Sequence, residues 1–265
     1  MFTLPAEPQA LGKVLDTGFK LFKVSIKECI IFGILLGVVV LVQMLVVPEP
    51  VINPGGLQGG ALAQTDFNLA NYLLLTFLFG IISYGIFVGL IYKYVAILSG
   101  NSLRVGAAIA KGYQKIIPLI IWYILYGILV AIGFVVLIIP GLYLMVSLMF
   151  GVYAIVMEDL GPIAALKKSH ELVKGNWWRT TGFLTVIMVI LMVVYVAFLF
   201  PAGYVGSIVS ATSDSQAMMK LSVGAGYAVA TALIAPLSSA LFLVYYKDLI
   251  LRKGGEDLAA KIAQS

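Results

Sequence analysis

Three kinds of side chain in this sequence could carry out chemistry: one histidine, two adjacent carboxylates and a set of lysines and arginines. His170 is the only histidine among 265 residues. A histidine acts as a metal ligand or general base only when further ligands, a nucleophile or a substrate group lie beside it. Few such partners surround His170, so we interpret it as a histidine at a membrane interface. The sequence therefore predicts no catalytic residue, no metal site and no cofactor.

The adjacent carboxylates, Glu158 and Asp159, have two interpretations. They could transfer protons as a pair. Alternatively, they mark the end of an apolar span just before a helix that begins near Pro162. Proline suits a first helical turn, and negative charge is stabilised near a helix N-terminus. We favour the second interpretation.

The composition places these residues in a membrane protein. Hydrophobic residues make up 62% of the chain and charged residues 11%, whereas a soluble domain is roughly half apolar and about a quarter charged. The net charge of +5 could indicate nucleic-acid binding. The positive charges stand beside apolar spans rather than in a soluble patch, which argues against a nucleic-acid partner.

The apolar runs predict an all-α integral membrane protein with a single polytopic domain. A helix needs about 20 apolar residues to cross a bilayer core. One uncharged run, 116–157, is twice that length and is interrupted by Pro140-Gly141, where we expect a tight turn. The spans predicted in this way are 29–47, 72–92, 116–138, 142–157, 181–200 and 221–246.

The distribution of lysine and arginine predicts the orientation. Of the 17 such residues, only Lys220 falls on the opposite side of these spans from the others. Positive residues favour the cytoplasmic side. We therefore expect both termini to be cytoplasmic. The cytoplasmic ends would be an amphipathic segment at 1–28 and a tail at 247–265, and 48–70 would form an outer loop.

A basic amphipathic segment precedes each odd-numbered span. In 11–26, 102–115 and 162–174, helical spacing separates an apolar face from a polar face that carries lysine or arginine. The order of amphipathic helix, span and span thus occurs three times, which predicts a threefold repeat. Two interpretations stay open: the segments lie in the interface plane near anionic headgroups, or they pack on the cytoplasmic end of the bundle.

The basic residues of these segments are the candidate contacts for anionic lipid or for a protein partner. Trp177 and Trp178 are candidate interface anchors, because tryptophan favours the headgroup level. The candidate contacts are Lys13, Lys20, Lys23, Arg104, Lys111, Lys115, Lys167, Lys168, Lys174 and Arg179.

One stretch, 139–183, carries a family resemblance. Its pattern consists of Pro140-Gly141, Glu158, Gly161-Pro162, Lys167-Lys168, Ser169, Leu172 and Gly175-Asn176-Trp177-Trp178. It resembles the YciC-type family of bacterial inner-membrane proteins and the related membrane domain fused to some glycerophosphoryl diester phosphodiesterases. The resemblance implies a helical membrane protein without an established activity. The phosphodiesterase chemistry belongs to a separate barrel with histidine and carboxylate ligands, which this chain does not match.

These patterns favour a non-enzymatic inner-membrane protein with a role in membrane or lipid homeostasis. It would act through lipid or protein contacts at its cytoplasmic face. The alternative is a transporter or flippase for a small uncharged or lipid-like substrate, because Pro201 and Pro236 interrupt the last two spans and the segment order repeats. Small residues at four-residue spacing, such as Gly33 and Gly37, indicate close helix packing within the bundle or in a homo-oligomer.

Overall fold

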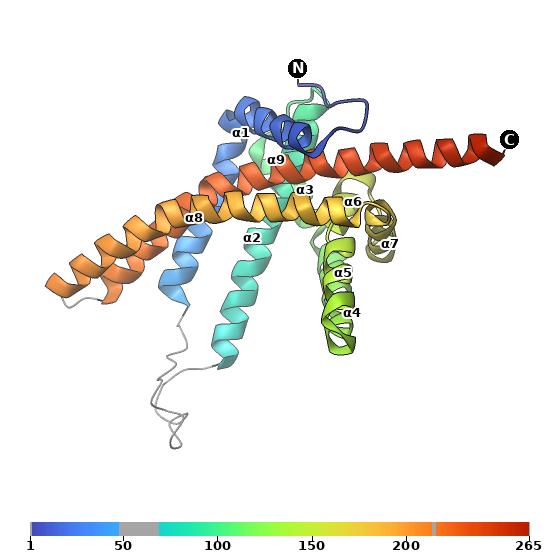
Figure 1. The fold of residues 1–265 in the computed structure, drawn as a ribbon. Coiled ribbons are helices and arrows are strands. Elements are labelled where there is room, and N and C mark those ends of the chain that lie inside the picture. The colour runs from blue at the N-terminus through green and yellow to red at the C-terminus, as the bar shows by residue number, and fades with distance from the viewer. Residues whose placement is uncertain (1, 48–68, 214–215, 265) are drawn as a thin grey trace.

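The computed structural model describes residues 2–47, 69–213 and 216–264, and Figure 1 shows these residues as a set of helices without strands. Six helical segments in these ranges are long and apolar enough to cross a membrane, which confirms the predicted multi-pass helical class. The predicted outer loop lies outside the described residues except at its end, where α2 begins at Leu69. The helices are α1 (Leu11–Val46), α2 (Leu69–Leu98), α3 (Val105–Gln114), α4 (Ile116–Val136), α5 (Ile138–Leu148), α6 (Gly151–Glu158), α7 (Pro162–Val173), α8 (Trp177–Ser213) and α9 (Gln216–Gln264).

The first amphipathic segment and the first span form one helix, α1, of 36 residues. The expected boundary near residue 28 is not a helix end, because no proline or capping residue interrupts the chain there. Figure 1 shows the first part of α1 across the top of the view and the rest descending from it. Ser25, which is buried, donates to the carbonyl of Leu21 at 2.7 Å, and such back-bonding from serine favours helix bending.

The core of the molecule includes a long seam between α1 and α9. A Cβ atom at Gly33 would overlap the carbonyl oxygen of Ala232, and one at Gly37 would overlap that of Ala228. These glycines therefore let the two backbones touch, which places the small-residue motif inside the chain. Proline has no N–H, so Pro236 leaves the Ala232 carbonyl without its helical donor. That same carbonyl faces Gly33, where a Cα–H group can approach it.

The turn between α4 and α5 lies earlier than expected. The break is at Leu137, which has an extended backbone (φ −165°, ψ 157°), and Pro140-Gly141 lies inside the first turn of α5. Proline is tolerated there because the first N–H groups of a helix have no partner within it. The prediction of a turn at Pro140-Gly141 was therefore wrong. A Cβ at Gly133 would lie 2.9 Å from the Cα of Gly141, so these two glycines let the hairpin close.

The fourth span is interrupted between α5 and α6. The backbone groups freed at this break are bound by Ser169 of α7, whose hydroxyl accepts from the Phe150 N–H at 3.1 Å and donates to the Ser147 carbonyl at 2.8 Å. Backbone groups at membrane depth need such internal partners. α6 ends at Glu158, as predicted, and the chain reverses at Asp159 in the left-handed region (φ 55°).

The last two helices, α8 and α9, are much longer than the predicted spans, at 37 and 49 residues. Both continue through their prolines, Pro201 and Pro236. α9 also continues through the predicted tail at 247–265 as far as Gln264. Figure 1 shows α8 and α9 crossing the view at a steep angle to α2 and α4. Helices longer than about 20 residues can cross a bilayer with a tilt.

Candidate functional site

Charged residues from distant parts of the sequence meet at one end of the molecule, the upper part of Figure 1. We call this region the charged end and define it as residues 2–28, 93–115, 158–179 and 247–255. The ion pairs that join different elements in the described part of the chain all lie here: Glu28–Lys93, Lys115–Asp159, Glu158–Lys168 and Arg179–Asp248. The basic segments therefore converge at one end of the bundle.

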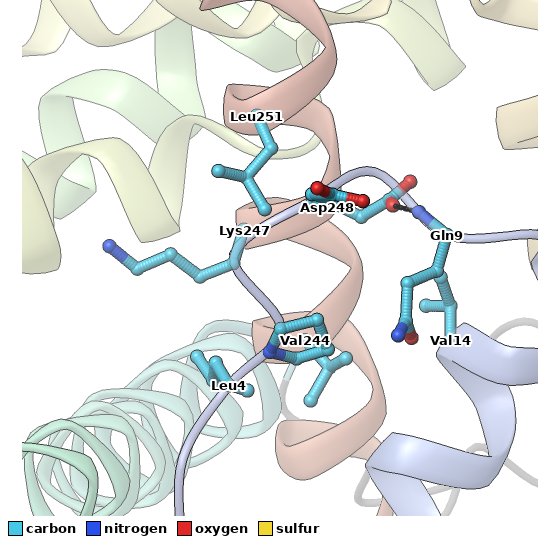
Figure 2. A pocket seen from close by; sticks show the side chains of 9 residues that line it. Leu4, Gln9, Val14, Val244, Lys247, Asp248 and Leu251 are labelled. Atoms are coloured by element: carbon cyan, nitrogen blue, oxygen red, sulfur yellow. Dashed lines mark hydrogen bonds between the residues drawn. The ribbon is translucent and has the colours of Figure 1, made fainter.

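The centre of the charged end is Asp248 of α9, which is only 5% exposed. Its Oδ2 atom lies 2.9 Å from the guanidinium of Arg179 and 2.8 Å from Nε of Arg252. Its Oδ1 atom accepts the backbone N–H of Gln9 at 2.7 Å, a bond drawn in Figure 2. A buried carboxylate is tolerated only when it is paired and hydrogen-bonded. Asp248 meets this condition on both oxygens.

The same arginines fasten the N-terminal segment to the bundle. The Gln9 carbonyl accepts from Arg179 at 2.6 Å and also from Arg252. Residues 4–9 thus lie against α9, and Figure 2 shows Leu4 beside Val244. The small cleft between them has a volume of about 10 Å³, which is room for about one water molecule. We therefore assign this cluster a structural role rather than a ligand-binding one.

A second buried charge, Lys93, ties α2 to the charged end. Its ammonium lies 2.6 Å from Glu28 of α1 and donates to the Leu103 carbonyl at 2.9 Å. Its side chain is 8% exposed. Sequence reasoning did not select Lys93, Asp248, Arg252 or Gln9. The spacing of Asp248 and Arg252, four residues apart on one helix face, was a signal for at least that pair.

Several predicted contact residues have partners within the chain. Arg179 is bound to Asp248, Lys168 lies 3.6 Å from Glu158, and Lys115 is paired with Asp159. The hydrogen bond to Asp159 raises the pKa of Lys115 above its ordinary value, so this lysine is charged at neutral pH. Lys20 pairs on its own helix with Asp16 at 2.7 Å. The ammonium of Lys111 lies 5.9 Å from the ring centre of Tyr92.

Other cations of the charged end are exposed, and no carboxylate pairs with them among the described residues. Five of them were predicted as contacts, and Lys27 was not. Glu7 and Glu171 are the exposed carboxylates of this end that form no ion pair within the same ranges. The surface therefore keeps a positive excess. We call these residues the exposed cation set: Lys13, Lys23, Lys27, Arg104, Lys167 and Lys174.

The two predicted anchor residues take different positions. Trp178 is 82% exposed, whereas Trp177 stacks on Tyr143 with ring centres 6.0 Å apart. His170 packs edge-on against the same tyrosine at 5.9 Å, which is a packing role. Across residues 2–47, 69–213 and 216–264, no three His, Cys, Asp or Glu side chains form a group that could hold a metal ion.

Comparison with known proteins identifies one family. A family described as a domain of unknown function, DUF7847, matches residues 66–249, which is more than half of the chain. The chain belongs to this family. No curated protein and no solved structure matches it. The match does not test the resemblance to the YciC-type family, which stays a prediction.

Proposed function

We propose that this member of the DUF7847 family is a non-enzymatic, multi-pass protein that binds anionic lipid headgroups through its charged end. The membrane would be a bacterial inner membrane, with both termini and the charged end in the cytoplasm. The observation that carries the proposal is the exposed cation set, which has no carboxylate partners among the described residues. Each lysine or arginine near an anionic leaflet gains about 1 kcal/mol.

The division between paired and exposed cations supports this proposal. The buried and half-buried cations, such as Lys93 and Arg179, are used inside the molecule to hold helices together. The exposed ones stand beside large apolar side chains that also face outward. Among these, Val24 is 65%, Ile163 63% and Trp178 82% exposed. Apolar side chains and cations on one surface are typical of a segment in the headgroup region.

The threefold repeat is part of the proposal and has local support at two places. The short helices α3 and α7 each precede a long apolar helix. On α3, Ala108 and Gly112 face the bundle, and on α7, Ser169 and Leu172 do so. Arg104, Lys111, Lys167 and Lys174 are exposed on the same segments. The two interpretations of these segments are therefore compatible: one face packs on the bundle and the other meets headgroups.

The experiment is to measure lipid enrichment around the full-length protein. The protein is reconstituted in bilayers with equal amounts of phosphatidylglycerol and phosphatidylcholine and extracted into polymer discs, and the lipids in the discs are counted. We expect enrichment of phosphatidylglycerol for the wild type. A variant with all six exposed cations changed to glutamine should lose most of this enrichment.

The control removes charged residues without changing the net charge. Lys20→Gln and Asp16→Asn together delete an exposed pair on the same helix. We expect this double variant to keep the wild-type enrichment. Equal enrichment in all three proteins would overturn the proposal.

The transport alternative has weaker support. It rested on interruptions by Pro201 and Pro236 and on the repeat, and both prolines lie inside continuous helices. The interruption between α5 and α6 is closed by Ser169, which binds the freed backbone groups on both sides. That break therefore leaves few backbone groups for a substrate. We accordingly place lipid binding ahead of transport.

A further inference from the structure

A groove separates α2 from α4. It is lined by residues between 77 and 84 of α2 and between 116 and 124 of α4, and its volume is about 510 Å³. Figure 1 shows the two helices diverging below α3. The volume lies within the range of about 300–1,000 Å³ that is typical of small-molecule sites. Its lining is apolar except for tyrosine hydroxyls.

The groove exists because α3 holds the two helices together only at one end. There Gly112 of α3 packs directly on Gly85 of α2, and a Cβ at Gly112 would overlap the Gly85 carbonyl oxygen. One turn further from the charged end, no other part of the described chain lies within 4 Å of the position that a Cβ at Gly80 would take. The absence of a side chain at Gly80 leaves space that neither helix fills.

One polar group in the groove lacks a partner. The hydroxyl of Tyr84 is buried and makes no hydrogen bond to any residue that the structure describes. Tyr84 is the lining residue of α2 nearest to α3, so it stands at the end of the groove that approaches the charged end. An unbonded hydroxyl in an apolar setting is unfavourable. Protein atoms cover this hydroxyl, so a ligand's oxygen acceptor would satisfy it only after the Tyr84 ring turns towards the groove.

Two cations stand beyond this end of the groove, towards Tyr92 and the charged end. Lys115 immediately precedes Ile116, the first lining residue of α4, and Lys111 is exposed one turn earlier on α3. Lys115 is paired with Asp159, whose side chain is 80% exposed. Counting both lysines and this aspartate, the mouth of the groove keeps one positive charge. A negatively charged headgroup therefore complements the mouth.

We propose that the groove holds one acyl chain of a single anionic phospholipid. Its phosphate would lie near Lys111 and Lys115, and an ester oxygen would accept from the Tyr84 hydroxyl. From Ile116 to Ile124, the groove extends about 12 Å along the helix axis. This is close to the depth of one leaflet, about 15 Å. The inference deepens the proposed function and rests on it, since it names the lipid class and one defined site.

A second copy of the chain is a less suitable occupant. A symmetric pairing through this groove would bring the same patch of each copy together. Lys111 and Lys115 of one copy would then approach those of the other, and like charges oppose such a pairing. Lipid brings the opposite charge to this mouth.

The test uses the full-length protein and native mass spectrometry. The protein is released in mild detergent from bilayers with equal phosphatidylglycerol and phosphatidylcholine, and retained lipids are counted. We expect one retained phosphatidylglycerol per chain. Gly80→Leu should lower this occupancy at least tenfold, because its side chain enters the groove. The matched control is Gly127→Leu on α4. A Cβ at Gly127 also meets open space, but Gly127 does not line the groove. It should keep the lipid.

Two further variants test the headgroup and the hydroxyl. Lys111→Gln with Lys115→Gln should remove most of the preference for phosphatidylglycerol over phosphatidylcholine while a lipid is still retained. Tyr84→Phe should lower occupancy severalfold with little change in headgroup preference. Equal retention in the Gly80 and Gly127 variants would overturn the proposal. A loss of dimer instead of lipid in Gly80→Leu would also overturn it and would identify a second copy as the occupant.

The outcomes for the groove and for the proposed function are separable. The variant with all six residues of the exposed cation set changed to glutamine leaves Lys111, Lys115 and Tyr84 intact. It should lose the general enrichment of phosphatidylglycerol but keep the single tightly held lipid. Gly80→Leu leaves the exposed cation set intact, so it should keep bulk enrichment whether or not the groove binds lipid. Failure of one proposal therefore does not imply failure of the other.

Discussion

The α1–α9 seam and the α2–α4 groove use glycine in opposite ways. At Gly33 and Gly37 the missing side chain is replaced by backbone atoms of α9, so the helices are in direct contact. At Gly80 no other part of the described chain lies within 4 Å of the position that a Cβ would take. The difference shows that a small residue marks close packing only where a second backbone approaches it. Where none does, the same residue leaves open space, which at Gly80 belongs to the groove.

The largest expected effect is at the closed seam. In Gly33→Leu, the new Cβ would overlap the Ala232 carbonyl oxygen, and a backbone atom cannot move aside as a side chain can. Overpacking of this kind costs about 3 kcal/mol or more. We expect a marked drop in the midpoint of unfolding measured in mixed micelles. The protein that remains folded should keep nearly the helix content of the wild type. An unchanged midpoint would show that α1 and α9 are not in contact here.

The second effect concerns the charges at the end of that seam. Asp248→Ala would leave Arg179 and Arg252 without their shared carboxylate and would release the Gln9 N–H. Removing one partner of a buried pair costs about 3 kcal/mol. We expect lower stability in the same assay and faster proteolysis of the N-terminal segment. Asp16→Asn is the comparison variant: Asp16 and its partner Lys20 are 60% and 66% exposed, so its effect should be smaller.

The contrast between these regions also marks the limits of prediction from sequence. Hydropathy was sufficient for the six spans because each needs only a long apolar run. The spacing of Gly33 and Gly37 indicated close packing, but the identity of the partner helix depends on how distant segments meet. The break at Leu137 was missed because Pro140-Gly141 is the stronger local turn signal. Nothing local required proline to fall inside the first turn of α5.

The charged residues show the same limit. Their position at one end followed from counting lysines and arginines between spans. The same count does not tell which of these residues turn inward. Arg179 and Trp178 are adjacent in sequence, yet only the tryptophan is exposed. Burial of Arg179 depends on Asp248, 69 residues later. Pairing across such separations is set by tertiary contacts and cannot be inferred from one segment alone.

A smaller effect is expected at the break in the fourth span. Ser169→Ala removes the hydroxyl that binds the Phe150 N–H and the Ser147 carbonyl. Leaving such groups without partners costs about 1–3 kcal/mol. We expect a modest loss of stability, with faster hydrogen exchange at Phe150 than in α4. Ser169→Thr keeps the hydroxyl and serves as the control. An exchange rate at Phe150 that does not change would show that the backbone there has another partner.

The smallest expected effect is at the open groove. Gly80→Leu places a side chain where a Cβ meets no atom within 4 Å, so the free energy of unfolding should change by less than about 0.5 kcal/mol. The leucine also removes glycine's excess backbone freedom in the unfolded chain, which favours the helix. We expect Gly80→Leu and Gly127→Leu to unfold at the same midpoint as the wild type, while Gly33→Leu does not.

A loss of stability in Gly80→Leu as large as that in Gly33→Leu would mean that another backbone lies against Gly80 in the membrane. The groove would then be a closed seam, and the distinction between the two uses of glycine would not hold for this pair of helices.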